Sequence, residues 1–498
     1  MLFKLKFKSE GDYISFKENS SLIKFFVDSD QLKNQLDNFF ESLGLKISEL
    51  QKNNFLDKKN DVLTYYNNEG EPSIIFLKKV KLDKEFNCDF FRNYFAGLIP
   101  SLVNKKLKEL HIVTPILEPF KNYFDSIDYL IQTILEGIAL GNYTFDKYKS
   151  DKKNPEDLLV SIHFTDSAIV KRIIESSEKI MSAVYFARDL VNEPSAVLTP
   201  LEFARRTKLE LQKYGLSVKI FDEKELKKRK MNAILTVGKG SKNKPCMIVI
   251  HYKPEIKTRR KIVLVGKGVT YDSGGLSIKP TGSMIDMKAD MSGGALVVGV
   301  IKAAAQLKMP VELIGIIPAV ENMPGGNSYK PGDVIISASG KSIEVKDTDA
   351  EGRIILADAL YYASQQKPDE IIDFATLTGA CAVALGEIAA GLFTSYDELA
   401  ERLLKAGFKT YERLWRMPFW NDYKSMIKSE IADVANLGPR WGGAITAGKF
   451  LEHFVDEKIP WAHIDIAGPA IKHRANNYTH KYDTAFGVRL MIEYLRSL

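Results

Sequence analysis

The sequence predicts an α/β protein with two domains. We expect a C-terminal domain built on a mixed, mostly parallel sheet covered by helices on both faces, and a smaller N-terminal α/β domain. The chain has 498 residues, whereas a single hydrophobic core stops growing near about 250–300 residues. In addition, near-continuous apolar strands alternate with helical segments, which is typical of parallel sheets that are buried on both faces.

The N-terminal α/β domain is expected to span residues 1–150. Apolar residues and lysines alternate in Leu2–Phe7, as in a strand, and Ser29–Leu43 has helical spacing behind a capping Ser or Asp. The sequence predicts further strands at 72–77 and 110–115, and further helices at 90–107 and 123–140. No cluster of catalytic side chains is visible in this half, and His111 is interpreted as a core residue.

A linker and connecting helix are expected at 151–195. The polar run 146–157 indicates the linker, and a short strand (158–164) and a long helix (169–191) follow it, the latter ended by Pro194. The catalytic domain is expected at 196–498. Its predicted helices are 201–214, 223–230, 295–307, 354–365 and 487–498, and its predicted strands are 217–221, 247–252, 262–265, 311–318, 342–345, 370–375 and 461–466.

Composition excludes several classes of protein. The chain is 45% hydrophobic and 27% charged, which is ordinary for a globular protein. Cys88, Cys246 and Cys381 form no Cys-x-x-Cys pair, so neither a disulfide framework nor a thiolate zinc site is indicated. The chain shows no signal peptide and no apolar run of about 18 residues, so no membrane span is expected, and we predict a cytoplasmic protein. The net charge is +7, and the basic run 257–261 favours a solvated loop over a nucleic-acid patch.

Acidic residues repeatedly follow predicted strands, beside glycines, in the segment Lys261–Arg353. Because a parallel sheet gathers the residues that follow its strands at one edge, we expect these side chains to converge on one pocket. Convergence of carboxylates is costly unless cations lie between them, so the segment indicates a two-metal hydrolytic site. The converging residues are expected to be Asp272, Asp290, Asp349 and Glu351, together with Lys267 and Lys279.

Other chemistries fit the sequence less well. Gly266 and Gly268 follow a strand as in a dinucleotide-binding loop, but Tyr271 stands at the position of the third glycine. No phosphate-binding Gly-x-x-x-x-Gly-Lys-[Ser/Thr] motif is present, and Asp272 would repel phosphate. The sequence also contains neither a Gly-x-Ser-x-Gly nucleophile motif nor a His-Glu-x-x-His zinc motif.

Carboxylate oxygens suit Mn and Mg, and also Zn where carboxylates dominate. Two metal ions about 3.5–4 Å apart can share a hydroxide and stabilise a developing oxyanion. Lys267 would have to be neutral to bind a metal, and two nearby dications would lower its pKa. Considered alone, Lys267 is better explained as a surface lysine at a strand end. The three carboxylates and one guanidinium within residues 347–353 favour the metal site over the surface interpretation.

Several segments resemble the leucine aminopeptidase family of di-metal peptidases, the cytosol aminopeptidases. The resemblance covers roughly residues 187–498, with Thr348-Asp-Ala-Glu-Gly-Arg as its most specific motif. The other motifs are Ala187-Arg-Asp-Leu-Val-Asn-Glu-Pro, Gly266-Lys-Gly-Val-Thr-Tyr-Asp-Ser-Gly-Gly, Ala375-Thr-Leu-Thr-Gly-Ala and Trp461-Ala-His-Ile-Asp-Ile-Ala-Gly. The family implies metal-dependent removal of N-terminal residues, preferably apolar ones such as Leu or Met, from short peptides with a free amino group.

The resemblance also implies residue roles. One metal position would use Lys267, Asp272, Asp290 and Glu351, and the other would use Asp272, Asp349 and Glu351. Lys279 would act as an electrophile toward the scissile carbonyl, and Arg353 would hold a bicarbonate that serves as general base toward a metal-bridging hydroxide. The metals would be Mn or Zn, with Co or Mg as substitutes in vitro. The pocket for the substrate would include Lys279, Met287, Thr376, Leu377, Gly379, Ala467 and Ala470, although plain core packing explains Met287 equally well.

One position departs from the family pattern. Asp347 stands where the family usually has Asn, which adds a negative charge beside the site and could shift the metal preference or the pH optimum. The resemblance further implies a homohexamer built as a dimer of trimers. Two narrower hypotheses remain open: hydrolysis of Cys-Gly dipeptides, and a DNA-binding architectural role beside the peptidase.

Overall fold

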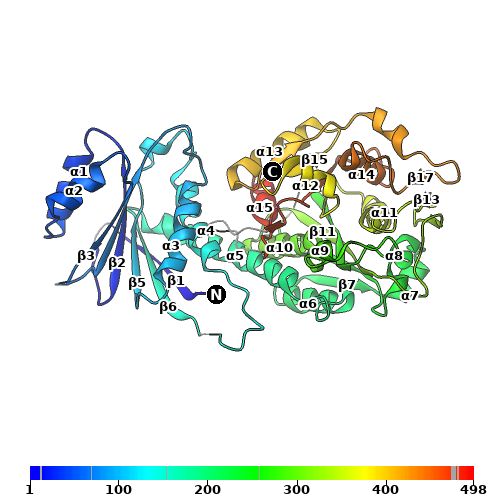
Figure 1. The fold of residues 1–498 in the computed structure, drawn as a ribbon, viewed down its shortest axis with the longest axis horizontal. Coiled ribbons are helices and arrows are strands. Elements are labelled where there is room, and N and C mark those ends of the chain that lie inside the picture. Colours follow the sequence, from blue (N-terminus) through cyan, green and yellow to red (C-terminus); the bar gives the residue numbers. More distant parts are fainter. Residues whose placement is uncertain are drawn as a thin grey trace. The chain divides into compact units, whose positions relative to one another are not determined.

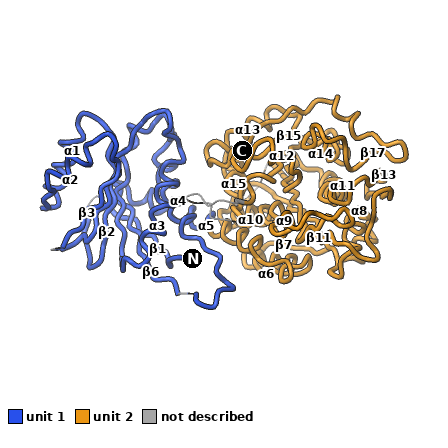
Figure 2. The backbone as a smooth tube through the Cα atoms, viewed as in Figure 1, with its two compact units in different colours: residues 1–181 blue, residues 182–498 orange. Residues whose placement is uncertain are grey.

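Figure 1 shows the computed structural model, which describes residues 1–11, 14–68, 70–152, 154–256, 258, 260–472, 478 and 482–498. The described residues form two compact units, Met1–Met181 and Ser182–Leu498 (Figure 2). Each unit contains a sheet with helices against it, so the predicted α/β fold class is confirmed. In the described part of the chain, every helix is too short or too polar to cross a membrane.

Unit 1 is built on a six-stranded sheet in the order β1-β6-β5-β2-β4-β3, in which only β3 and β4 pair antiparallel. Successive residues of β2 point to opposite faces, so Ile23 and Phe25 enter one core while Leu22 and Phe26 enter the other. The strands are β1 (Phe3–Glu10), β2 (Ser20–Val27), β3 (Val62–Tyr66), β4 (Ile74–Val80), β5 (Glu109–Val113) and β6 (Glu156–His163).

The helices of unit 1 lie on both faces of its sheet. Residues of α1 and α2 pack with Leu22 and Phe26, and residues of α3 and α4 pack with Ile23 and Phe25. The helices are α1 (Leu32–Ser42), α2 (Glu49–Leu56), α3 (Phe90–Leu102), α4 (Ile127–Asn142) and α5 (Ser167–Asn192), with a 3-10 turn η1 (Glu118–Phe120). Helix α3 ends at Leu102 rather than at the predicted residue 107, and Asn104 and Lys106 just beyond it have positive φ.

The first sheet extends beyond the 150 residues that composition suggested. Strand β6 pairs in parallel with both β1 and β5, so residues 156–163 belong to unit 1. The division between the units falls inside α5, after Met181. His111 is buried in β5, as expected for a core residue, and its Nδ1 lies 2.9 Å from Nε2 of His163.

Unit 2 is built on a nine-stranded sheet whose main path is β16-β15-β18-β14-β9-β11-β8-β7, with β10 paired to β11. The four central strands are parallel. Strand β8 runs antiparallel to both β7 and β11, and β15 runs antiparallel to β18 but parallel to β16, which matches the predicted mixed sheet. The strands are β7 (Ser217–Phe221), β8 (Cys246–Tyr252), β9 (Lys261–Gly266), β10 (Gly268–Asp272), β11 (Glu312–Asn322), β14 (Glu370–Ala375), β15 (Ala390–Phe393), β16 (Leu414–Arg416) and β18 (Trp461–Asp465).

Helices α10 and α11 cover opposite faces of this sheet. Gly315 of β11 faces α10, because a Cβ added there would meet Ile301 and Val297, whereas its neighbour Ile316 shares a core with Ile355 of α11. The helices of unit 2 are α6 (Pro200–Gln212), α7 (Glu223–Lys228), α8 (Asn232–Val237), α9 (Thr281–Met284), α10 (Ser292–Leu307), α11 (Glu351–Gln365), α12 (Gly379–Leu385), α13 (Asp397–Thr410), α14 (Gly443–Glu452) and α15 (Val488–Arg496), with 3-10 turns η2 (Gly238–Gly240), η3 (Met287–Ala289) and η4 (Asn421–Ile427).

One predicted strand does not belong to the main sheet. Strand β13 (Ser342–Glu344) pairs with β12 (Val334–Ile336) and β17 (Val434–Ala435) in a separate small sheet, so the expectation that Asp349 and Glu351 follow a strand of the parallel sheet is wrong. A short hairpin joins β19 (Ile471–Lys472) and β20 (Tyr482–Asp483). In the basic run, Lys257 and Arg259 lie outside the described residues, while Arg260 forms an ion pair with Glu370.

Candidate metal centre

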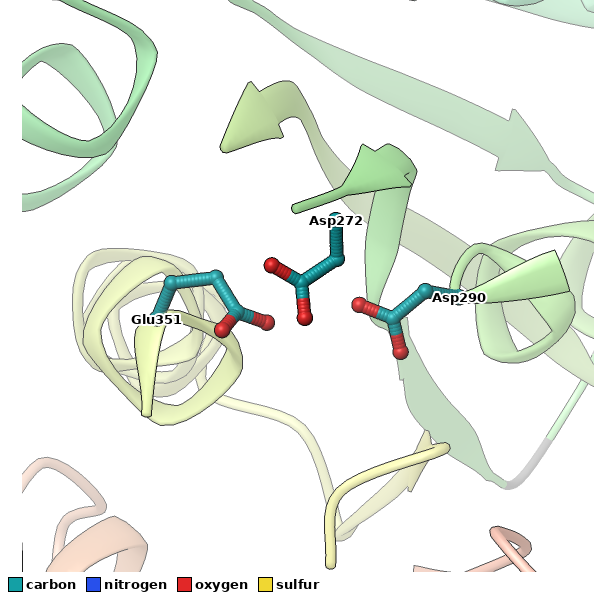
Figure 3. Close-up of side chains that lie close together, drawn as sticks. All are labelled: Asp272, Asp290 and Glu351. Atoms are coloured by element: carbon teal, nitrogen blue, oxygen red, sulfur yellow. The ribbon is translucent and has the colours of Figure 1, made fainter. Parts of the chain in front are cut away.

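The candidate centre lies where the central parallel strands of unit 2 end. The last residues of β9, β14 and β18 are in register, since Gly266 pairs with Phe374 and Ala375 pairs with Asp465. Lys267 follows β9, Asp272 ends β10, Asp290 follows the turn η3, and Glu351 begins α11. The close-up in Figure 3 shows the carboxylates of Asp272, Asp290 and Glu351 turned toward one another.

These three carboxylates are buried and close together. One oxygen from each lies within 4.8 Å of the others, and their side chains are almost fully buried. Burial and the charge of Asp272 raise the pKa of Glu351 well above its ordinary value. Burial also raises the pKa of Asp290, although the ammonium of Lys267 opposes that rise. The cluster therefore concentrates negative charge that requires cations for its stability.

Two lysines supply cations within the protein itself. Nζ of Lys267 lies 2.7 Å from Asp290 and 2.9 Å from Glu351, and it donates to the carbonyl of Thr376 at 3.1 Å. Nζ of Lys279 lies 2.9 Å from Asp272 and 2.5 Å from Asp349. The six residues predicted to converge therefore form two sets of ion pairs, one around Lys267 and one around Lys279. The close approach of Asp272 to Asp290 and Glu351 brings the two sets together.

Burial alone would lower the pKa of both lysines, but the surrounding carboxylates outweigh burial and raise it. For Lys267 this direction is opposite to the one expected beside two dications. The reason is that the ammonium of Lys267 is itself the countercharge to Asp290 and Glu351 in the protein alone.

The approach of Lys267 to the start of α11 requires a glycine. A Cβ added to Gly352 would lie 2.5 Å from Cε and 2.7 Å from Nζ of Lys267. The sequence Ala-Glu-Gly-Arg thus brings Glu351 to the first turn of the helix and leaves room beside it for the lysine. A carboxylate at that turn is also favoured by the positive end of the helix dipole.

The donor set fits divalent metal ions. Among the described residues, Oε2 of Glu351 is buried and has no hydrogen-bond partner. Carboxylate oxygens are the ligands that Mn²⁺ and Mg²⁺ prefer, and Zn²⁺ accepts them as well. A buried anionic oxygen without a donor is costly to keep unless a cation binds it. The side chains of Asp272, Asp290 and Glu351 could therefore hold a metal ion.

Arg353 lies two residues beyond Glu351 and is buried. Its Nη1 donates to the carbonyl of Asn436 at 2.8 Å, whereas its Nε has no hydrogen-bond partner in the described part of the chain. Burial lowers the pKa of Arg353 to about 10, with Glu351 and Asp465 opposing that change. A buried guanidinium with an unused donor is suited to binding a small anion.

The residues expected to line a substrate pocket lie beside this edge. Thr376 and Leu377 follow β14: the Thr376 hydroxyl donates to Asp290 at 2.8 Å and the Leu377 amide donates to Asp465 at 3.1 Å. Met287 begins η3, and Gly379, the first residue of α12, has open space where a Cβ would be. After β18, Ala467 is half-buried, and Ala470 is fully buried.

Sequence reasoning missed two buried asparagines that support the centre. Asn322, at the end of β11, donates to Asp272 at 2.8 Å and to the carbonyl of Thr348 at 2.9 Å. Because Asn322 stands at the end of an apolar strand, the sequence could have indicated it as a site residue. Asn436 follows the two-residue strand β17, where no sequence pattern marks it. Its side chain accepts from the Lys346 amide at 2.7 Å and donates to the carbonyl of Asp347 at 2.6 Å.

Asp347 takes part in the same loop. Its Oδ1 accepts from the amide of Asp349 at 2.8 Å. The carboxylate that replaces the family's usual Asn therefore hydrogen-bonds the backbone of a proposed metal ligand. An Asn side chain offers an equivalent acceptor oxygen, so this hydrogen bond does not depend on the departure.

Comparison with known proteins identifies the family. A model described as the cytosol aminopeptidase family, catalytic domain, matches residues 185–492. The chain belongs to the cytosol aminopeptidase family. A probable cytosol aminopeptidase of Chloroherpeton thalassium is 42% identical to this chain over 503 residues, which cover 95% of this chain and 96% of the relative. Another from Aquifex aeolicus is 42% identical, with 90% of each chain covered.

Solved structures are similar to this chain over nearly its whole length. A variant of tomato leucine aminopeptidase has a TM-score of 0.87 and 30% identity, covering 100% of this chain and 97% of that one. The bottromycin maturation enzyme BotP in complex with Mn has a TM-score of 0.82 and 30% identity, covering 96% and 98%. The chain is therefore a metal-dependent aminopeptidase.

Proposed function

We propose that this cytosol aminopeptidase removes apolar N-terminal residues, such as Leu or Met, from short peptides, and that it does so with two divalent metal ions. The observation that carries the proposal is the buried cluster of Asp272, Asp290 and Glu351 with Lys267 against it. Such a cluster offers oxygen donors to more than one cation, and it lies at the strand ends where α/β sheets bind ligands.

The proposed ligands are those that the resemblance to the family implies. Lys267, Asp272, Asp290 and Glu351 would hold one ion, and Asp272, Asp349 and Glu351 would hold the other. Mn²⁺ and Zn²⁺ are the proposed ions, and the chemistry that they supply when bound is polarisation of a carbonyl and activation of water. An internal peptide nitrogen is a poor metal donor, so a free amino group would be selected at this centre.

The chain's own cations would act on the substrate and on the base. Lys279 carries a charged ammonium held by Asp272 and Asp349, and we propose that it donates a hydrogen bond to the scissile carbonyl oxygen as negative charge develops there. Arg353 is proposed to hold bicarbonate as the general base, supported by its buried guanidinium and its unused Nε.

The proposed substrate pocket is lined by backbone and small or apolar side chains. Met287, Thr376, Leu377, Gly379, Ala467 and Ala470 are the residues assigned to it, together with Lys279. Open space at Gly379 and the half-buried positions of Met287 and Ala467 support this assignment. Apart from Lys279, the assigned residues carry no charge, and such a lining favours Leu and Met over charged side chains.

The test is hydrolysis of Leu-p-nitroanilide by the metal-stripped protein after addition of Mn²⁺, Zn²⁺, Co²⁺ or Mg²⁺. We expect metal-restored cleavage of this substrate and none of N-acetyl-Leu-p-nitroanilide, because acetylation removes the amino group that would bind at the centre. Comparing Leu-Gly with Cys-Gly turnover separates a broad aminopeptidase from a Cys-Gly dipeptidase. Equal cleavage of the blocked and free substrates would contradict the proposal.

We further propose a homohexamer and a cytoplasmic location, the latter in keeping with the name cytosol aminopeptidase that the relatives carry. Light scattering on the purified protein is expected to give six times the chain mass of 56.1 kDa. A monomer mass at micromolar concentration would contradict the hexamer without affecting the assignment of the metal ligands.

A further inference from the structure

In unit 1, the carboxyl ends of β2 and β5 form a second place whose geometry suits ligand binding. These strands are parallel neighbours. From β2 the chain continues through α1, α2 and β3 to β4 on one side, and from β5 it continues through α4 to β6 on the other side. Adjacent strands whose connections leave in opposite directions form a topological switch point, which is where open α/β sheets bind ligands.

A cavity of about 1020 Å³ lies at this switch point. It is lined by residues of β2 and α1, by residues 113–118 after β5, and by residues 163–165 at and after the end of β6. Its size matches the upper range of small-molecule sites, which is about 300–1,000 Å³. Four phenylalanines line it: Phe26 and Phe39 belong to the core on the α1 face of the sheet, and Phe25 and Phe164 to the core on the other face.

Lys24 brings a positive charge to the cavity. Its Nζ lies 5.1 Å from the ring centre of Phe39 and 5.9 Å from that of Phe26. In the described part of unit 1, no carboxylate forms an ion pair with Lys24. Burial lowers its pKa, so the ammonium is partly removed from water. A partly desolvated cation that lies over aromatic rings and forms no ion pair in this part of the chain favours an anionic ligand.

The other charged groups of the lining leave this preference intact. Glu118 forms an ion pair with Lys121 at 2.5 Å, so its charge is compensated nearby. Both nitrogens of His163 are engaged, one with Gly11 and one with His111, and burial lowers its pKa. The amide side chains of Gln35 and Asn38, which lie on α1, add neutral hydrogen-bonding groups.

We propose that this cavity binds a small molecule in which a planar aromatic ring carries an anionic group. The ring would pack among the phenylalanines, and the anion would lie at the ammonium of Lys24. Nucleoside monophosphates and aromatic carboxylates share this chemistry. The site belongs to unit 1, so it is independent of the peptidase centre and of its metals.

The experiment is calorimetric titration of the full-length protein with four probes. Adenosine monophosphate and indole-3-acetate carry a ring and an anion, adenosine carries the ring alone, and inorganic phosphate carries the anion alone. We expect at least one of the first two to bind, and adenosine and phosphate to bind at least about tenfold more weakly. Binding of the nucleotide or of the carboxylate tells which source the site uses.

Two variants and one control locate the binding. Lys24→Met keeps the apolar stem but removes the charge, and it is expected to weaken binding at least about tenfold. Asn38→Trp places a large ring at an exposed position of α1 beside the cavity and is expected to block binding without disturbing the core. Lys33→Met changes an exposed lysine of the same helix and should bind like the wild type. The proposal is overturned if neither ring-bearing anion binds, or if both Lys24→Met and Asn38→Trp leave binding unchanged.

Discussion

At the scale of single residues, the charges of the candidate centre depend on one another. Asp272, Asp290 and Glu351 are buried close together, and the ammonium groups of two lysines offset their repulsion, with hydrogen bonds from Asn322 and Thr376 adding to this. Removing one charged partner from such a group leaves another buried charge uncompensated, which typically costs about 3–5 kcal/mol. Substitutions that keep shape while removing charge therefore test roles better than alanine.

Asn436 is predicted to position the acidic loop. It hydrogen-bonds the backbone of Lys346 and Asp347 through its side chain, and its carbonyl accepts from Arg353. In Asn436→Asp, an oxygen would face the Asp347 carbonyl in place of a donor. We expect kcat for Leu-p-nitroanilide to fall about 10–100-fold with little change in KM, because orientation of ligands is lost rather than substrate contacts.

Titration with Mn²⁺ provides a second readout for Asn436→Asp. The affinity of this variant for Mn²⁺ should fall by a similar factor. Asn54→Ala, at an exposed position of α2 in the other unit, is the control. A normal kcat and a normal Mn²⁺ affinity in folded Asn436→Asp would show that this asparagine does not position the loop.

The site residues that could be predicted from the sequence are those that belong to a motif. The four carboxylates and two lysines were expected to converge from their places beside glycines, and they lie together in two neighbouring sets of ion pairs. Asn322 and Asn436 were not found, because an amide that supports a loop needs no particular spacing from the residues it supports. Whether the six residues act as proposed is a question for the variants.

At the scale of elements, β14 and β18 share a buried polar pair that stabilises the centre of the sheet. Asp373 accepts from Nδ1 of His463 at 2.6 Å and from Nε1 of Trp461 at 2.7 Å. His463 also stacks on Phe393. Burial alone would lower the pKa of His463, but Asp373 outweighs burial and raises it, with Asp465 adding to the rise and Arg353 opposing it.

This pair predicts a pH dependence of stability. Because the folded-state pKa of His463 is above the ordinary value near 6.5, its contribution is fully present below about pH 6.5 and is lost as the pH rises through the folded-state pKa. His463→Gln should lower the thermal midpoint by roughly 5–10 °C at pH 6, and by less at higher pH. Differential scanning calorimetry from pH 6 to 9 measures the difference.

The exposed His251→Gln is the matched control, since His251 pairs with Glu312 at the surface. It should lower the midpoint little at any pH. A difference between the wild type and His463→Gln that stays constant from pH 6 to 9 would rule out the titration of His463 as its cause.

Elements were predictable where apolar runs were continuous. Strands β14 and β18 are buried throughout and β9 is buried beyond its first residue, and their sequences allowed assignment almost to the residue. Strand β10 was missed because Gly-Val-Thr-Tyr-Asp mixes glycine with polar residues, and only its pairing with β11 makes it a strand. Strand β13 was assigned to the wrong sheet, because its pairing with β17 joins segments about 90 residues apart, which no local pattern records.

At the scale of the whole molecule, the candidate site of each unit lies at the carboxyl ends of parallel strands. In unit 2 the carboxyl ends of β9, β14 and β18 lie beside the carboxylate cluster, and in unit 1 the carboxyl ends of β2 and β5 lie beside the aromatic cavity. The first site could be predicted from the sequence because charged motifs mark it. The second is lined by aromatic, aliphatic and polar residues that no sequence motif marks, so only the folded arrangement shows it.

The most direct test of the central claim is calorimetric titration of the metal-stripped protein with Mn²⁺. If the centre holds two metals, two ions should bind per chain in the wild type and in the control Asp422→Asn, which removes an exposed carboxylate. In Glu351→Gln, both positions lose a shared ligand, so binding should weaken at least about tenfold at each and hydrolysis should be lost. Fewer than two ions per wild-type chain, or unchanged binding in Glu351→Gln, would contradict the two-metal centre.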